Sequence, residues 1–157
     1  MKWILAAALG LTIALPAAAF AQQTPKMTKQ KTSATRQVTV KVRQKEPYGS
    51  YLTNGRGRAL YVFMADSKGE STCYDKCAQA WPPLLGNAKA GKGVQASKLG
   101  TTKRKNGRTQ VTYNGMPLYY FVKDKGARTT AGEDIKGFGA EWYLVSPQGS
   151  KVEGKKS

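Results

Sequence analysis

Residues 60–84, LYVFMADSKGESTCYDKCAQAWPPL, decide the fold because they combine a compact aromatic strand, both cysteines of the chain and a Trp-Pro-Pro. The first residues of this stretch are large and apolar, which predicts a buried strand. Residues 66–69 begin with Asp and end with Gly, as type I turns favour. The rest of the chain is predicted to be an export signal, a spacer or a second version of this unit.

A short helix is predicted after the turn. Ser71 can cap a helix over residues 72–80, and Pro82-Pro83 ends it because proline cannot continue the hydrogen-bond ladder. Cys73 and Cys77 are four residues apart, so they would lie on one face of this helix.

The N-terminal segment has the pattern of a secretory signal peptide. Lys2 precedes an apolar run over residues 3–15, and Ala19-Phe20-Ala21 fits the small-x-small cleavage rule, which predicts a signal peptide over residues 1–21. The run is shorter than the roughly 20 residues that span a bilayer, so no transmembrane segment is expected. Gln22 follows the cut, where a lipid-anchored protein would have Cys. We therefore expect a soluble protein that is exported to the periplasm or secreted.

Charge is the second signal in the composition. The chain carries 26 Lys and Arg against 9 Asp and Glu, and cleavage after Ala21 would remove one Lys and leave a net charge of +16. This excess predicts either association with an anionic envelope surface or polymer, or charge that serves only solubility. Nucleic acid is not an expected partner of an exported protein in the cell. Residues 22–36 are polar and basic, with few large apolar groups, and are predicted to be a disordered tether.

Strand and turn signals predict a single β-rich domain over residues 37–147. Val38, Val40 and Val42 alternate with polar residues, as in a half-buried strand, and the cationic face of this strand suits a sheet edge. The apolar segments on either side of Asn54-Gly55 predict a hairpin.

The second half of the domain contains the clearest predicted hairpin, with strands over residues 101–104 and 109–113. Its turn, Asn106-Gly107, has the residues that adopt the positive φ angles of a type I′ turn. Asn114-Gly115 then leads into a third strand over residues 118–122. Composition assigns the other segments: loops over residues 86–93 and 123–139, a last strand over residues 142–145 and a basic tail over residues 148–157.

An internal repeat is visible, with copies near residues 51–84 and 99–147. The motif residues of the first copy, Tyr61, Phe63 and Asp66, recur 58 positions later as Tyr119, Phe121 and Asp124, and Trp81 is echoed by Trp142. In each copy Tyr and Phe lie on one strand face, and Leu and the residue between them lie on the other. Both faces should therefore be covered. The first copy carries the Cys pair, whereas the second carries a Gly-rich loop.

These strings resemble a bacterial family of secreted-repeat proteins, predicted lipoproteins with a Tyr-x-(aromatic)-x-x-Asp motif. The resemblance is carried by the doubled Tyr-x-Phe-x-x-Asp core, by Ser-x-Cys-x-x-x-Cys-Ala-x-x-Trp-Pro-Pro-Leu over residues 71–84, by residues 99–101 and 110–119, and by Gly139 with Trp142. It covers about residues 50–147 and implies an exported or lipoprotein-like envelope protein whose biochemical role is unassigned. The chain differs from the lipoprotein members because it lacks an N-terminal lipobox cysteine.

Three roles are open for Cys73 and Cys77. An oxidising compartment and an even cysteine count favour a structural disulfide. A redox pair would need a lowered thiol pKa, which Lys76 and a helix N-terminus would favour, although the spacing is not Cys-x-x-Cys. Together with Met64 the two sulfurs could bind Cu(I), whereas the absence of His argues against a zinc site.

The other conspicuous residues also have two interpretations each. Asp66 and Asp124 are predicted to cap turns at strand ends, and a paired acid–base role is the alternative. The large aromatic residues are predicted to be structural core, and exposed rings that stack on sugars or bases are the alternative. This set comprises Tyr61, Phe63, Trp81, Tyr119, Phe121 and Trp142.

No enzyme class is supported by these residues. The absence of His excludes Ser-His-Asp and Cys-His catalysis, and no helix follows residues 54–57, unlike a phosphate-binding loop. We expect no cofactor and no metal. The predicted fold is a small α+β, mostly β domain of two diverged hairpin or meander repeats, with one short helix that carries the Cys pair. The predicted function is a non-enzymatic envelope binding or interaction module; the alternative is an envelope thiol-redox or copper-handling accessory that uses Cys73 and Cys77.

Overall fold

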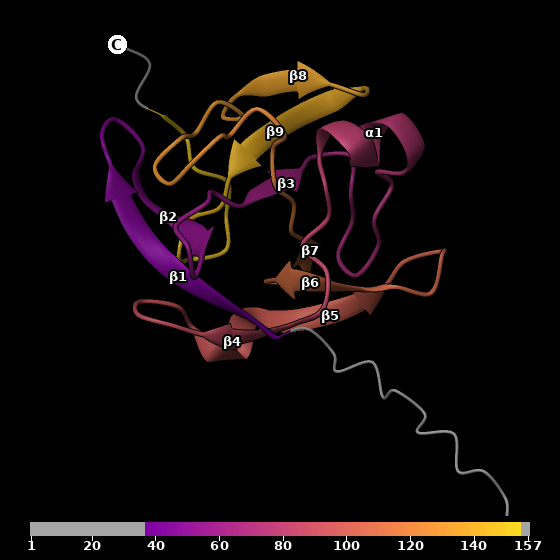
Figure 1. Ribbon diagram of the computed structural model, residues 1–157, viewed down its shortest axis with the longest axis horizontal. Helices are drawn as coiled ribbons and strands as arrows, with labels where there is room; N and C mark the ends of the chain where they lie inside the picture. The colour runs from indigo at the N-terminus through magenta and orange to yellow at the C-terminus, as the bar shows by residue number, and fades with distance from the viewer. Residues whose placement is uncertain (1–36, 155–157) are drawn as a thin grey trace, which may run out of the picture. The chain divides into compact units, whose positions relative to one another are not determined.

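The computed structural model describes residues 37–154, drawn in colour in Figure 1. The predicted signal peptide, the predicted tether and the last three residues of the predicted tail lie outside this range. The described part is mostly β with one short α-helix, which confirms the predicted fold class. Its strands are β1 (Gln37–Lys45), β2 (Gly49–Asn54), β3 (Tyr61–Phe63), β4 (Asn87–Ala90), β5 (Leu99–Lys103), β6 (Thr109–Tyr113), β7 (Met116–Pro117), β8 (Ile135–Gly137) and β9 (Ala140–Leu144), and its helices are α1 (Asp75–Ala80) and the 3₁₀ helix η1 (Ala96–Lys98).

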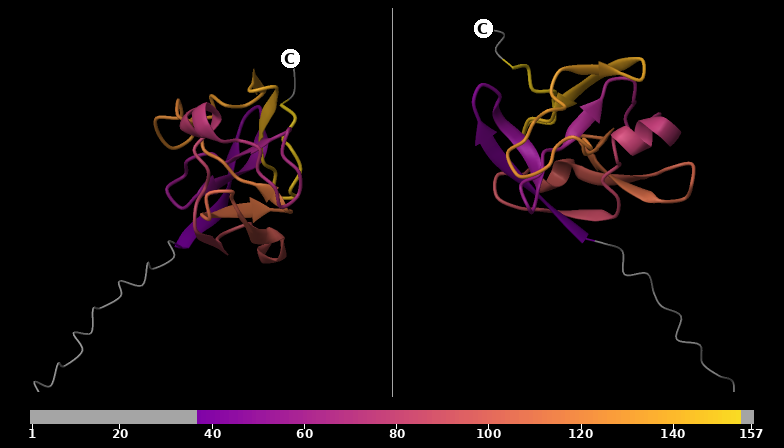
Figure 2. Two further views of the ribbon diagram at one scale, coloured as in Figure 1. Left: turned by 90° about the vertical axis from the view of Figure 1, so that its right-hand side faces the viewer. Right: turned by 45° about the horizontal axis from the view of Figure 1, so that its top comes forward.

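The strands of residues 37–154 form three small sheets. Their orders are β2-β1-β4, β3-β9-β8 and β5-β6-β7. The β8–β9 hairpin and the β5-β6-β7 sheet lie on opposite sides of β3, as Figures 1 and 2 both show. The short strand of the first repeat copy therefore lies in the interior of the domain.

β1 is the strand predicted from the alternating valines, but it lies at the centre of its sheet and not at an edge. β4 pairs with it in parallel, with Val40 opposite Ala90. The edge prediction and the predicted loop over residues 86–93 were wrong because β4 has the sequence NAKA, whose residues are depleted in strands. The absence of a side chain at Gly91 permits the close approach, because a Cβ there would lie 2.8 Å from the Val40 carbonyl oxygen.

The chain turns at Asn54-Gly55 as predicted, yet β3 does not continue a hairpin with β2. After a bridge between Thr53 and Ala59, β3 pairs with β9, with Phe63 opposite Trp142. Local periodicity predicts that a segment is a strand, but it does not show which distant strand pairs with it.

The β5–β6 hairpin is confirmed, but its turn type is not. Gly107 has a positive φ of 77° and Asn106 does not, whereas Asn114 and Gly115 have φ of 50° and 83°, as a type I′ turn requires. The strand that follows is only β7, and Tyr119 instead makes single bridges to Tyr61 and Pro83. β8 lies within residues 123–139, which were predicted to be a loop, so that prediction missed a short strand.

The helix is shorter than predicted. α1 begins at Asp75 after Tyr74 and ends at Ala80, so it contains Cys77 but not Cys73. Ser71 does not cap it, because the Ser71 hydroxyl hydrogen-bonds the Tyr119 hydroxyl 2.7 Å away. The predicted placement of both cysteines on one helix face was therefore wrong.

The two faces of the repeat strands belong to two buried clusters. Tyr61 and Phe63 lie in one cluster, and Leu60 and Val62 lie in the other. Val152 is also buried, and its N–H donates to the Leu144 carbonyl 2.8 Å away, so part of the C-terminal segment packs on the domain. Within residues 37–154, no helix has the length and apolar character needed to cross a membrane.

Candidate functional site

The two repeat motifs interlock around an approximate twofold relation. The N–H groups of Tyr61 and Tyr119 each donate to the carbonyl of the other residue at 2.9 Å. The Tyr61 hydroxyl donates to Asp124 at 2.7 Å, and the Tyr119 hydroxyl donates to Asp66 at 2.5 Å. Each tyrosine is therefore bound to the carboxylate of the other repeat copy.

Both carboxylates also hold the loops that follow them. Asp66 accepts hydrogen bonds from the Thr72 N–H and hydroxyl at 2.7 and 2.8 Å, and Asp124 accepts one from the Ala131 N–H at 2.9 Å. Burial raises the pKa of each aspartate, and hydrogen bonds to the charged form oppose this. The oxygens of both carboxylates accept hydrogen bonds from tyrosine hydroxyls and backbone N–H groups. This geometry supports a role of the two aspartates in capping loops and not a paired acid–base role.

Four aromatic rings from the two copies form a continuous stack. Phe63 lies 4.2 Å from Trp142, Trp142 lies 3.9 Å from Trp81, and Trp81 lies 4.1 Å from Phe121, measured between ring centroids. All four side chains are buried. Both faces of each indole are covered by another ring, so neither indole is open to a stacking ligand.

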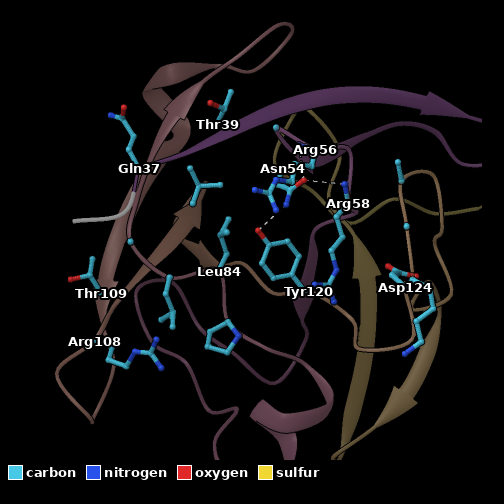
Figure 3. Close-up of a pocket in the computed structure, with 18 residues that line it drawn as sticks. Gln37, Thr39, Asn54, Arg56, Arg58, Leu84, Arg108, Thr109, Tyr120 and Asp124 are labelled. Atoms are coloured by element: carbon cyan, nitrogen blue, oxygen red, sulfur yellow. Dashed lines mark hydrogen bonds between the residues drawn. The ribbon is translucent and has the colours of Figure 1, made fainter. Parts of the chain in front are cut away.

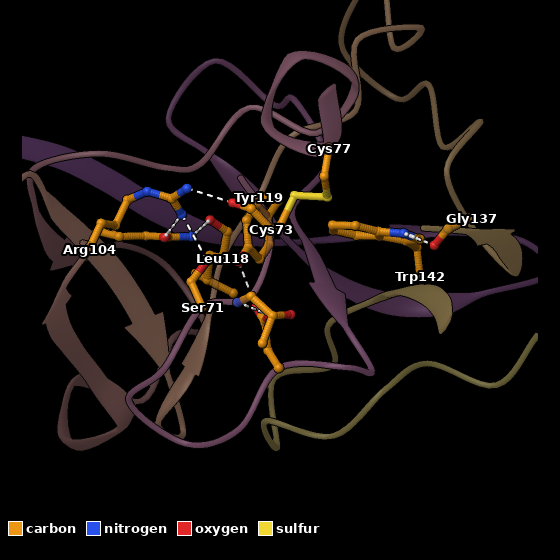
Figure 4. Close-up of a disulfide and its surroundings, with 11 residues drawn as sticks. Ser71, Cys73, Cys77, Arg104, Leu118, Tyr119, Gly137 and Trp142 are labelled. Atoms are coloured by element: carbon orange, nitrogen blue, oxygen red, sulfur yellow. Dashed lines mark hydrogen bonds between the residues drawn. A yellow bond between two sulfur atoms is a disulfide. The ribbon is translucent and has the colours of Figure 1, made fainter. Parts of the chain in front are cut away.

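Cys73 and Cys77 form a disulfide with 5.2 Å between their Cα atoms. Cys73 is fully buried and Cys77 nearly so, and the bond lies beside Trp142 and Tyr119 (Figure 4). Sulfurs that are bonded to each other are not thiolates, so the copper hypothesis requires a reduced pair. The described residues contain no group of three or more His, Cys, Asp or Glu that could hold a metal ion.

A buried arginine supports the disulfide loop. Arg104 is 5% exposed, and its guanidinium donates to the Cys73 carbonyl at 2.6 Å and to the Ser71 hydroxyl at 2.9 Å (Figure 4). It also donates to the Gln110 side chain at 2.6 Å and lies 4.3 Å from the ring centroid of Tyr74. The three hydrogen-bond acceptors of the Arg104 guanidinium are all neutral groups. Two of them belong to the loop that carries the cysteines, so Arg104 holds this loop in place.

A large open cleft lies at the surface, and the six rings Tyr61, Phe63, Trp81, Tyr119, Phe121 and Trp142 do not line it. It has a volume of about 1000 Å³, and Figure 3 shows the side chains around it. Its basic residues are Arg56, Arg58, Arg108 and Lys125. Asp124 is the acidic residue in its lining, but it is 4% exposed and bound to Tyr61. The cleft is therefore positively charged.

The turn after β2 holds its arginines in place. The Asn54 side-chain oxygen accepts hydrogen bonds from the N–H groups of Arg56 and Arg58 at 3.0 Å each, and the Asn54 amide donates to the Tyr120 hydroxyl at 3.2 Å. The Arg58 guanidinium lies 4.5 Å from the Tyr120 ring centroid and donates to the Phe121 carbonyl at 2.7 Å. The guanidinium of Arg58 is thus oriented before any ligand arrives.

From the sequence, residues 54–57 were predicted only to form a turn, and this cleft was not predicted. A comparison of the loop lengths in the two repeat copies could have indicated it. Leu60 and Leu118 donate to the carbonyls of Leu52 and Val111, so the intervening loop is one residue longer in the first copy. That longer loop carries two arginines, whereas residues 112–117 carry no charged residue.

Comparison with known proteins agrees with this repeat architecture. A family described as a secreted repeat of unknown function matches the chain twice, over residues 42–85 and 100–146. No curated protein and no solved structure matches the chain. The two matched segments together cover more than half of the sequence and contain the two interlocked motifs. The chain therefore belongs to this family of secreted repeats.

Proposed function

We propose that the protein is an exported, non-enzymatic binding module that attaches to an anionic polymer or surface of the cell envelope. The cationic cleft carries this proposal. Within residues 37–154, Lys151–Glu153 is the one ion pair, so none of the cleft cations forms a salt bridge, although the Asp124 carboxylate is close enough to Arg58 for the positive charge to favour its ionised form. The Lys and Arg residues of segments 22–36 and 148–157 would add weaker, salt-sensitive attraction.

The magnitude of this attraction suits reversible attachment. Arg56, Arg108 and Lys125 are exposed, and an exposed ion pair contributes about 0.2–1 kcal/mol. Three such contacts amount to roughly 0.6–3 kcal/mol, or about three- to 140-fold in affinity. A polymer with repeated negative charges could make several of these contacts at once.

Export by a cleaved signal peptide is part of this proposal. The signal peptide over residues 1–21, with cleavage near Ala21, would deliver the protein to the periplasm or outside the cell. The reciprocal ties of Tyr61 with Asp124 and of Tyr119 with Asp66 also support the view that Tyr-x-(aromatic)-x-x-Asp is the structural motif of the repeat.

Binding of a uniformly anionic polymer to matched charge variants tests the proposal. The cleft variant combines Arg56→Gln, Arg108→Gln and Lys125→Gln. The control variant combines Lys76→Gln, Lys92→Gln and Lys136→Gln, which are exposed, do not line the cleft and remove the same charge. Polymer affinity is measured for both over a series of salt concentrations, and circular dichroism verifies that both are folded.

The two variants should separate a site from a general charge effect. We expect the cleft variant to lose about tenfold in affinity, and the control about threefold or less, with binding of the native protein weakening as salt rises. Equal losses in the two variants would show that only net charge matters. Affinity that does not change with salt would contradict the electrostatic proposal altogether.

A further inference from the structure

We infer that the cleft binds a segment of acidic polysaccharide, with a sugar carboxylate on Arg58 and the sugar ring against the surface around Tyr120. This inference rests on the proposed function and names the ligand class for the same cleft. Three features of the cleft support the inference: the difference between the repeat copies, the geometry of the Arg58 guanidinium, and the presence of both apolar and neutral polar residues in the lining.

Several of the cleft residues differ between the two repeat copies. Tyr120 occupies the position between the motif Tyr and Phe, and the first copy has the buried Val62 there. Arg56 and Arg58 come from the longer loop of the first copy, whose counterpart in the second copy is uncharged. The shared core is symmetric, whereas the cleft departs from that symmetry by gaining an aromatic ring and two guanidinium groups.

Arg58 presents a planar, partly satisfied guanidinium. One terminal nitrogen is bound to the Phe121 carbonyl, and the plane is held near the Tyr120 ring. The Nε of Arg58 is buried, so a ligand in the cleft would meet the terminal N–H groups of this guanidinium. A carboxylate oxygen is an acceptor that these N–H groups match.

The rest of the lining suits a sugar better than a bare polyphosphate. Val38, Pro83 and Leu85 are partly exposed and provide apolar surface in the same cleft as Tyr120, against which the C–H groups of a pyranose ring can pack. Gln37, Thr39 and Thr109 provide neutral polar groups for sugar hydroxyls. A polyphosphate has neither apolar surface nor hydroxyl groups, so it would leave both parts of the lining unused.

Calorimetric titration of the mature protein with three oligomers tests the inference. Oligogalacturonate has a carboxylate on every sugar, its methyl ester has the same sugars without charge, and a polyphosphate of equal charge has no sugar. The key variant is Arg58→Lys, which keeps the charge and loses the planar fork. Tyr120→Leu removes the ring, and Lys136→Gln in β8 is the control outside the cleft.

We expect oligogalacturonate to bind about tenfold more tightly than the polyphosphate at one ionic strength, and the methyl ester to bind weakly. Arg58→Lys and Tyr120→Leu should each reduce oligogalacturonate affinity by about fivefold or more, and leave polyphosphate affinity within about twofold. Polyphosphate binding as tight as oligogalacturonate binding overturns the inference and leaves the proposed function standing. Equal binding of the methyl ester overturns the role of the carboxylate, and no binding of either polyanion overturns the proposed function itself.

The comparison of ligands on the native protein does not depend on the folding of any variant. A variant that loses its circular dichroism spectrum is excluded, and the oligogalacturonate-to-polyphosphate ratio of the native protein still decides the question. A ratio of about one would refute the preference for a sugar.

Discussion

At the scale of single residues, the reciprocal tyrosine–aspartate bonds should contribute similar amounts to stability. Tyr61→Phe removes a donor from buried Asp124, and Tyr119→Phe removes one from buried Asp66. Each substitution should lower the free energy of unfolding by about 1–3 kcal/mol, because the carboxylate keeps its burial and loses a partner. Urea denaturation measures this loss. Tyr74→Phe is the control, since its hydroxyl accepts a bond from the exposed Lys105 N–H, and should cost about 0.5 kcal/mol or less.

Stability should also depend on pH through single carboxyl groups. Burial raises the pKa of Glu133 to about 7, although a hydrogen bond from the Leu144 N–H opposes the shift. A raised pKa means that the folded state binds more protons than the unfolded state between about 4.5 and 7, so stability falls as pH rises through that range. Burial shifts Asp66 and Asp124 in the same direction.

Denaturant midpoints at pH 5 and pH 8 would test this, and we expect the native protein to be more stable at the lower pH. Glu133→Gln should flatten the pH dependence, because the amide oxygen can still accept the Leu144 N–H and carries no charge. An unchanged slope in this variant would assign the pH dependence to other groups.

At the scale of elements, the loop between β7 and β8 packs closely against two aromatic rings at Gly132. A Cβ on Gly132 would lie 2.7 Å from the Trp81 ring and 3.0 Å from the Tyr61 ring. Gly132→Ala should therefore lower the unfolding free energy by about 1–3 kcal/mol. Gly126→Ala in the same loop has nothing within 4 Å and should change stability by about 1 kcal/mol or less. Equal effects of the two substitutions in thermal denaturation would contradict the packing argument.

The disulfide should stabilise the segment before α1 to a limited extent. It joins residues with a sequence separation of 4, and a loop this short corresponds to about 2 kcal/mol in the chain-entropy account. Cys73→Ala combined with Cys77→Ala should lose about this amount and remain folded, because Arg104 still holds the Cys73 carbonyl.

A thiol count tests the redox alternative at the same bond. The two sulfurs are buried, so a mild reductant should release no thiol from the native protein and two from the unfolded one. Rapid release from the native protein would instead favour a redox role for Cys73 and Cys77.

At the scale of the whole domain, the two repeat copies should unfold together. β3 of the first copy pairs with β9 of the second, and the ring stack alternates between the copies. Tryptophan fluorescence and far-ultraviolet circular dichroism should therefore give one coincident transition. Trp81→Ala should cost about 3–5 kcal/mol and lower protection from hydrogen exchange in both copies. Two separated transitions would show that each copy is stable alone.

The sequence by itself determined the repeat and the mostly β character, because local spacing and composition carry this information. It left three roles open for Cys73 and Cys77, and the structure places them in a disulfide. The sequence did not determine that β3 pairs with β9, that Tyr61 meets Asp124 or that β4 completes the first sheet. It also did not show the cleft around Arg58. Those features depend on contacts between segments far apart in the chain, and such contacts follow from packing both faces of the strands at once. Only the tertiary structure decides which distant surface covers each face, and which one remains open to a ligand.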